Sequence, residues 1–177
     1  MFAVFRENAI SVGEPIVLDA VAETANQLGS EMDFDRAASA CNCLAARQAA
    51  RRITQFYDRF LAPAALRTTQ YSILAWLSHT GPMSIHALAQ AMVMDRTTLG
   101  RNILPLEREG LIAIVQSAKD RRSKEVSLTP AGRERMKLAH DGWREAQRQF
   151  EKAFGTERSS DLRAILRDVA TADLGEA

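Results

Sequence analysis

The sequence predicts a mainly α-helical protein that carries one small β-hairpin. Apolar residues recur every three or four positions over residues 34–61 and again over residues 130–154, which is the spacing of amphipathic helices. Between them, residues 111–115 and 124–128 are rich in apolar and β-branched side chains and flank a charged loop, as expected of two paired strands. The two long helices therefore flank a smaller region in the sequence, which holds shorter helices and the hairpin.

Composition favours a soluble protein with one core. The 177 residues are 46% hydrophobic and 25% charged, and no apolar run approaches the roughly 20 residues that span a bilayer. The N-terminus lacks a basic stretch followed by an apolar segment and a cleavage site, so we expect a cytoplasmic protein. The net charge of +1 hides an uneven distribution, because residues 95–135 carry nine basic residues against six acidic ones.

We expect three parts along the chain. Residues 1–33 form an acidic N-terminal extension. Residues 34–62 and 130–172 form a helical dimerisation region, in which Pro63 stops the first long helix. Residues 63–129 form a separate lobe between them.

Short helices are predicted inside this lobe from their capping residues. Thr68 suits the N-cap of a helix that ends near Gly81, and Ser84 suits the N-cap of a short helix after it. Asp95 then opens a further helix, because its carboxylate accepts hydrogen bonds from exposed backbone amides and favours the positive end of the helix dipole.

The last long helix has an equally clear beginning and end. Thr129 caps it, Pro130 occupies its first position and Gly155 ends it. A final amphipathic helix follows, which contains Leu162, Ile165, Leu166 and Val169. The apolar residues of the long helix that begins at Pro130 are spaced by four and three positions and form a seam that needs a partner helix. The seam residues are Ala139, Trp143, Ala146, Phe150 and Ala153.

The helix after Asp95 has two different faces. At about 100° per residue, its apolar side chains share one side, and polar ones share the other. The apolar set is Leu99, Ile103 and Leu106, and the opposite set is Thr97, Arg101 and Arg108. The apolar side would hold the helix to the body, so the other side would face outward.

The hairpin loop is strongly basic. Lys119, Arg121, Arg122 and Lys124 surround a single acid, Asp120. An arginine at such a tip can enter the narrow minor groove of DNA, where negative potential is focused, and Asp120 can orient Arg121 by a charge-assisted hydrogen bond.

Two helices, a turn and a basic hairpin in this order predict a winged helix-turn-helix that binds double-stranded DNA. The helix pair alone could be a packing module, and the basic hairpin loop alone could be an ordinary solvated loop. The candidate base-reading residues are Thr97, Thr98, Arg101 and Asn102, because arginine can pair with guanine and asparagine with adenine. Arg96 is better placed for a phosphate.

The stretch from Ser84 to Thr129 resembles the multiple-antibiotic-resistance regulator (MarR) family, with the flanking helices extending the likeness over about residues 36–172. The matching residues are Leu88-Ala89, Asp95-Arg96-Thr97-Thr98, Leu106-Glu107, Gly110-Leu111, Asp120-Arg121, Leu128-Thr129 and Gly132. The resemblance implies a regulator, most often a repressor, that forms a homodimer through its first, fifth and sixth helices. It also implies a roughly palindromic operator whose half-sites lie about one DNA turn apart.

The resemblance further implies release from DNA by a small aromatic or phenolic effector. Such effectors bind in a crevice between the dimerisation helices and the DNA-binding lobe. The residues on the helices that would border it are Phe56, Tyr57, Phe60, Tyr71, Trp76 and His79, and Arg47 and Arg51 are available to bind a carboxylate. Taken singly, each of the apolar ones also fits an ordinary core position.

Cys43 raises a second possibility, because the peroxide-sensing branch of the family has a reactive cysteine early in its first helix. Tyr57, Pro63 and Gln70-Tyr71 fall where that branch has its own Tyr, Pro and Gln-Tyr, but Arg47 stands where it has a second tyrosine. Arg47 could favour the thiolate that oxidation requires. A buried and inert Cys43 is the competing interpretation.

Other function classes have less support. No phosphate-cradling glycine loop, HExxH motif or serine-nucleophile elbow is present, so we expect no enzyme and no cofactor. A thiol-dependent enzyme using Cys43, or a helical adaptor that has lost DNA binding, remain the alternatives. Cys41 with one of the three histidines has no diagnostic metal-ligand spacing, and a structural disulfide between Cys41 and Cys43 is not expected.

Overall fold

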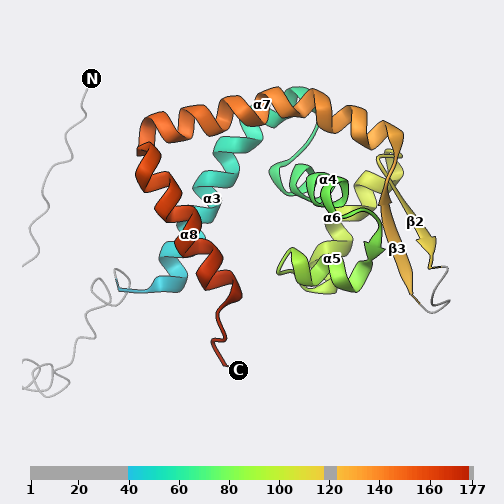
Figure 1. Ribbon diagram of the computed structural model, residues 1–177, viewed down its shortest axis with the longest axis horizontal. Helices are drawn as coiled ribbons and strands as arrows, with labels where there is room; N and C mark the ends of the chain where they lie inside the picture. The colour runs from blue at the N-terminus through green and yellow to red at the C-terminus, as the bar shows by residue number, and fades with distance from the viewer. Residues whose placement is uncertain (1–39, 118–122, 176–177) are drawn as a thin grey trace, which may run out of the picture. The chain divides into compact units, whose positions relative to one another are not determined.

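The computed structural model describes residues 40–117 and 123–175, and the chain divides into two units, residues 1–47 and 48–177. The described helices are α3 (Asn42–Leu61), the short 3-10 helix η1 (Ala62–Ala64), α4 (Thr68–Thr80), α5 (Ile85–Ala91), α6 (Arg96–Arg108), α7 (Pro130–Phe154) and α8 (Thr156–Thr171). The strands are β1 (Met83–Ser84), β2 (Ile112–Gln116) and β3 (Lys124–Leu128) (Figure 1). The mainly helical class with a small hairpin is confirmed. The predicted extension, residues 1–33, lies outside the described residues.

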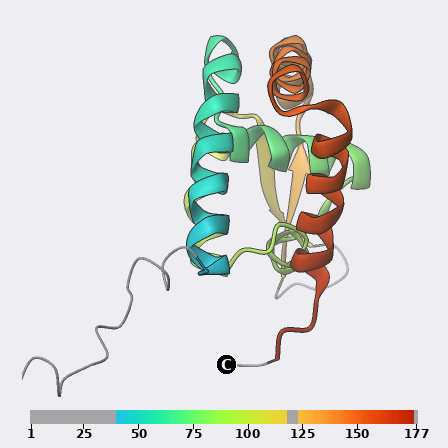
Figure 2. The same ribbon diagram turned by 90° about the vertical axis from the view of Figure 1, so that its left-hand side faces the viewer.

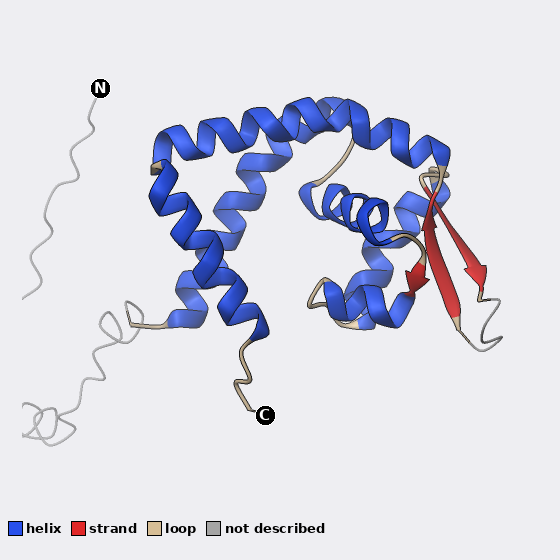
Figure 3. Cartoon of the chain, in the orientation of Figure 1, coloured by secondary structure: helices blue, strands red, loops and turns tan. Residues whose placement is uncertain are grey.

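The strands form one antiparallel sheet in the order β1-β3-β2 (Figure 3). Ile112 pairs with Leu128 and Gln116 with Lys124, so β2 and β3 form the hairpin that the sequence predicts, with β2 shifted by one residue. β1 was not predicted. It adds two residues to the other side of β3, where Met83 pairs with Val126, and so joins the sheet to the start of α5.

The core is built around α4 and the inner face of the sheet. Ile73, Leu74 and Leu77 of α4 are fully or almost fully buried, and Val126 of β3 lies in the same cluster. The prediction that Thr68 is the N-cap was wrong by one position. Arg67 is the N-cap and Thr68 the first helical residue. Asp58 of α3 accepts hydrogen bonds from both the Thr68 backbone N–H and its hydroxyl at 2.7 Å, so this end of α4 is tied to α3.

Capping chemistry also sets the start of α3. The sequence predicted a helix from Phe34, whereas the described part of this segment becomes helical at Asn42. Cys41 takes the capping role, since its Sγ accepts a hydrogen bond from the Leu44 N–H at 3.4 Å. The predicted stop before Pro63 is confirmed, because α3 ends at Leu61.

The predicted seam of α7 has its partners within the same chain. Trp143 stacks on Tyr71 of α4, with ring centroids 6.2 Å apart, and Phe150 packs against Phe56 of α3 at 6.3 Å. Ala139 and Ala146 are buried. The partner helices that the seam needs are therefore largely α3 and α4.

After Gly155 the chain turns into α8, which leaves apolar side chains exposed. Figure 2 shows α8 descending from the end of α7. Ile165, Leu166 and Val169 are each about half exposed or more, and the helix begins at Thr156, directly after Gly155. None of the helices in residues 40–117 and 123–175 is long and apolar enough to cross a membrane.

Two glycines of α7 allow it to approach its neighbours closely. A Cβ on Gly142 would lie 2.3 Å from the Phe60 carbonyl oxygen, and one on Gly132 would lie 2.0 Å from the Leu111 carbonyl oxygen. Both obstacles are backbone atoms, which cannot swing aside as a flexible side chain would. Because neither glycine has a side chain, the α7 backbone can pack directly against the end of α3 and the residue before β2.

Replacing Gly142 with alanine is expected to destabilise the protein by about 1–3 kcal/mol, the usual cost of overpacking. The matched control is Gly100→Ala in α6, where a Cβ would meet nothing within 4 Å. That change should stabilise by up to about 1 kcal/mol through helix propensity. Urea unfolding of both variants checks the pair, and equal shifts of the same sign would contradict the close approach at Gly142.

Candidate nucleic-acid interface

α6 is held by one face and presents the other, as the sequence predicts. Leu99, Ile103 and Leu106 are buried in the core. Thr97 and Arg101, on the opposite side, are exposed, and their side chains make no hydrogen bond or ion pair with any described residue. An arginine with all its donors available on an exposed helix face can pair with the edge of a guanine.

The first turn of α6 is fixed by Asp95. Its carboxylate accepts hydrogen bonds from the Thr98 N–H at 2.8 Å and from the Thr98 hydroxyl at 2.6 Å, which confirms the predicted N-cap. The Asn102 side-chain amide donates back to the Thr98 carbonyl oxygen at 2.8 Å. Thr98 and Asn102 are therefore engaged within the helix, and to read a base Asn102 would first have to exchange this bond.

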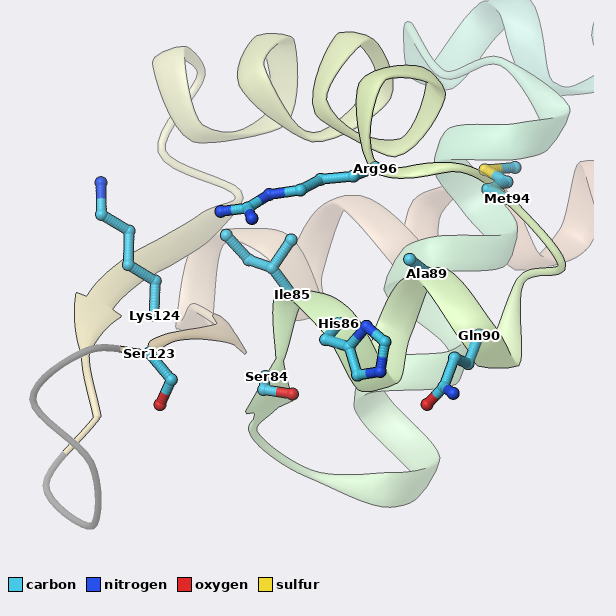
Figure 4. Close-up of a pocket in the computed structure, with 9 residues that line it drawn as sticks. All are labelled: Ser84, Ile85, His86, Ala89, Gln90, Met94, Arg96, Ser123 and Lys124. Carbon is cyan, nitrogen blue, oxygen red and sulfur yellow. The ribbon is translucent and has the colours of Figure 1, made fainter.

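A hollow of about 710 Å³ lies between α5, the start of α6 and β3. In Figure 4, Arg96 reaches from α6 across this hollow, Lys124 projects from β3, and His86 and Gln90 project from α5. None of the described residues that line it is acidic. Two permanent cations beside a concave surface without carboxylates suit the phosphate backbone of a nucleic acid.

His86, Gln90 and Lys124 were absent from the site predicted by sequence. His86 and Gln90 are four residues apart and share the polar face of α5 opposite the buried Leu88, so helical spacing could have indicated them. Lys124 was counted only with the loop. Its place at the hollow depends on the register of β3 against β2, which no local pattern reveals.

The loop between β2 and β3 holds the other predicted DNA contacts. Lys119, Asp120, Arg121 and Arg122 lie outside the described residues. At the edge of the loop, the Ser117 N–H donates to the Ser123 carbonyl oxygen at 2.9 Å, and the Ser117 hydroxyl donates to Glu125 at 2.6 Å. These bonds extend the hairpin one pair beyond Gln116 and Lys124.

The predicted effector residues fall into separate groups. Phe56, Tyr57 and Phe60 form an aromatic cluster on α3, where the Tyr57 hydroxyl donates to Gln147 of α7. Burial raises the pKa of the Tyr57 phenol, and nearby Arg163 offsets part of that rise. The other rings of the set lie on α4, with Tyr71 buried and Trp76 and His79 exposed.

Tyr71 belongs to a stack that the sequence did not indicate. Its hydroxyl lies 3.3 Å from Nδ1 of His140, and both rings stack on Trp143 of α7. Burial raises the pKa of the Tyr71 phenol. Arg47 and Arg51 are exposed on α3.

Both cysteines are free and exposed, so the interpretation of Cys43 as a buried residue is wrong for the single chain. In the part of the chain that the structure describes, no three His, Cys, Asp or Glu side chains are placed to hold a metal ion.

Comparison with known proteins assigns the family. The MarR family model matches residues 66–124, which run from the end of η1 into β3. The crystal structure of the Mycobacterium tuberculosis regulator MosR in complex with DNA is 32% identical, covers 75% of this chain and 99% of its own, and superposes with a TM-score of 0.62. This chain belongs to the MarR family. It is therefore a DNA-binding transcription regulator with a winged-helix fold, and not an enzyme.

Two curated MarR-type relatives differ in the direction of control that their names state. The transcriptional activatory protein BadR of Rhodopseudomonas palustris is 33% identical over 89 residues, which are 49% of this chain and 51% of BadR. The homoprotocatechuate degradative operon repressor of Escherichia coli is 26% identical over 125 residues, which are 71% of this chain and 84% of the repressor. The chain thus aligns with about half of the first relative and most of the second.

Asp95→Ala is expected to lower the urea midpoint of the protein at pH 7, because the first turn of α6 loses its cap. The hydrogen bonds from Thr98 hold the pKa of Asp95 below its usual value of 3.8. The contribution of the carboxylate is therefore complete well above that pH and is lost as the pH falls through the lowered pKa. The difference in urea midpoint between the wild type and Asp95→Ala should therefore decrease as the pH is lowered from 7 to 3.5.

Asp95→Asn is the matched control, since asparagine caps helices nearly as well as aspartate. It should keep most of the stability at pH 7. If Asp95→Asn proved as damaging as Asp95→Ala, the negative charge rather than the hydrogen-bonded cap would be what matters.

Proposed function

We propose that this MarR-family chain acts as a homodimer that represses transcription by occupying a roughly palindromic operator, and that a small aromatic or phenolic molecule releases it. The DNA-reading part is supported by Arg101 on α6, which is exposed and has no side-chain partner among residues 40–117 and 123–175, and by the three buried side chains opposite it. A regulator of this kind works beside the chromosome, so we place it in the cytoplasm.

In the proposed complex the start of α6 enters the major groove. Thr97 and Arg101 contact base edges there, with Thr98 and Asn102 joining once Asn102 is released from the Thr98 carbonyl. Arg96 and Lys124, with His86 and Gln90, contact phosphates beside the groove. The loop residues Lys119, Arg121 and Arg122 reach the adjacent minor groove, with Asp120 orienting Arg121.

Dimerisation through α8 is supported by its exposed apolar residues Ile165, Leu166 and Val169. A chain that leaves such a row in water gains free energy when a second copy covers it. Two copies would then place two α6 helices about one DNA turn apart, which matches a palindromic site. Because the two curated relatives are an activatory protein and a repressor, we choose repression from the relative that aligns over more of its length.

The effector part rests on the aromatic residues already placed on α3 and α4, with Arg47 and Arg51 as cations for an acidic group. Trp76 is 41% exposed and His79 lies three residues further along the same helix. Exposed aromatic side chains on a helix offer contact area to a flat apolar molecule.

Operator binding tests the proposal with two variants. Arg121→Ala should weaken binding to all sequences about equally and reduce the slope of log affinity against log salt by about 1, because a groove or phosphate contact is lost. Arg101→Ala should instead relax base preference at one position, at a cost of about 1–3 kcal/mol for the preferred base. Fluorescence anisotropy on selected and single-substituted duplexes measures both effects.

Arg108→Ala is the control, since Arg108 is exposed at the far end of the same helix. It should leave base preference unchanged. Equal operator affinity in the wild type, Arg101→Ala and Arg121→Ala would contradict the proposed complex.

The exposed thiol of Cys43 favours a second candidate, release from DNA by oxidation. If a hydroperoxide releases the operator, Cys43→Ser should abolish the response, while Cys41→Ser should keep it. Tyr57→Phe would test the aligned tyrosine, although its hydroxyl is engaged by Gln147. An unchanged peroxide response in Cys43→Ser would eliminate this candidate.

A further inference from the structure

The turn between α5 and α6 contains a valine in the left-handed region of backbone conformation. Val93 has a φ of 50° and is 71% exposed. In this region the Cβ atom lies close to the following carbonyl oxygen, so glycine is favoured and a β-branched residue is an outlier. Val93 therefore combines an unfavourable backbone conformation with apolar surface left in water.

The hydrogen bonds of this turn require a left-handed residue at position 93. The Met94 N–H donates to the Ala89 carbonyl oxygen at 2.9 Å, and the Val93 N–H donates to the Gln90 carbonyl oxygen at 3.0 Å. This pair of bonds is a Schellman motif, which closes the end of a helix through one left-handed residue, most often glycine. Met94 packs against the hydrophobic core and anchors the motif directly after Val93.

Two other segments of the chain end in the same motif, and neither places a branched side chain there. After α6 the left-handed residue is Gly110, with a φ of 69°, and after η1 it is Ala65, with a φ of 52°. Among the residues that the structure describes, Val93 is the one β-branched residue with a positive φ. Folding alone would favour glycine at position 93, so the valine side chain indicates a contact made outside the chain.

Val93 continues the DNA-facing surface. Gln90 and Met94, which are its hydrogen-bonded neighbour and its successor in the turn, both line the hollow between α5, the start of α6 and β3 (Figure 4). Asp95, two residues after Val93, caps α6. Because a recognition helix brings its N-terminal residues to the base edges, the turn that precedes those residues lies beside the same groove.

The chemistry of the side chain limits what it can recognise there. Valine has no hydrogen-bonding group, and the apolar group that a base presents in the major groove is the C5 methyl of thymine. A branched apolar side chain that is already exposed in the free protein can cover such a methyl group without first leaving a core.

We propose that Val93 contacts a thymine C5 methyl group in each operator half-site and adds a base preference to the one that Arg101 supplies. The proposal rests on the proposed function for the entry of α6 into the major groove. The strain at Val93 belongs to the free protein, so it can be measured without DNA.

Urea unfolding of the full-length protein tests the strain. Val93→Gly should raise the urea midpoint, because glycine adopts a φ of 50° without a steric cost. Ala65→Gly is the matched control in the same motif and should raise the midpoint by less, since alanine is unbranched. A midpoint lowered by Val93→Gly would show that the valine stabilises the turn and would overturn the proposal.

Operator affinity should change in the opposite direction. Val93→Gly should weaken binding to a selected duplex by about tenfold, because each copy in a dimer loses an apolar contact. Ala65→Gly should bind the duplex as the wild type does. Misfolding cannot explain weaker binding by a variant with a higher urea midpoint. Unchanged operator affinity in Val93→Gly, or an equal loss in Ala65→Gly, would overturn the proposal.

Replacing thymines with uracil, one at a time, identifies the contact, because only the C5 methyl group is removed. At one position in each half-site the change should weaken wild-type binding by about three- to fivefold. At that position Val93→Gly should bind the thymine and uracil duplexes equally. If Val93→Gly kept the wild-type dependence on every thymine methyl, a looser turn would explain its weaker binding and the contact would be wrong.

Arg101→Ala separates this contact from the proposed function. If Arg101→Ala relaxes base preference but Val93→Gly leaves every thymine dependence unchanged, the Val93 contact is wrong and the proposed function stands. If neither variant changes binding to any duplex, both the contact and the proposed function are wrong.

Discussion

The DNA-facing surface depends on the burial of Leu99, Ile103 and Leu106 on one side of α6. Each side chain of this size contributes about 1.5–3 kcal/mol when it leaves water, so rotating the helix about its axis would cost several such terms at once. That cost keeps Thr97 and Arg101 outward, although their side chains make no polar contact with the residues that the structure describes. The Asp95 cap then fixes where the first turn begins, and the function follows from these two constraints together.

α7 connects α6 to the other elements of the unit formed by residues 48–177. At its start, Thr129 caps the helix and donates its hydroxyl to the Gly110 carbonyl oxygen at 2.7 Å, just after α6 ends. Gly132 and Gly142 bring its backbone against β2 and α3, so α7 cannot shift without disturbing both. Arg135 adds the contact to Glu109. A ligand or a second copy that moves α7 would therefore also move α6.

Sequence patterns located the elements whose ends are set by local chemistry. Thr129, Pro130 and Gly155 define α7 to the residue, and the spacing of Leu99, Ile103 and Leu106 identified the buried face of α6. β1 was missed because two residues are too short to show a period of two. The partners of the α7 seam and the place of Lys124 depend on contacts between distant segments, which helical spacing cannot supply.

The most direct test of DNA reading by α6 is dimethyl sulfate protection of a selected operator, because the reagent attacks guanine N7 in the major groove and adenine N3 in the minor groove. Bound protein should protect two clusters of guanine N7 on one face of the duplex, with centres about 10 base pairs apart. Protection confined to adenine N3, or a single unrepeated cluster, would contradict a pair of outward α6 helices in adjacent major grooves.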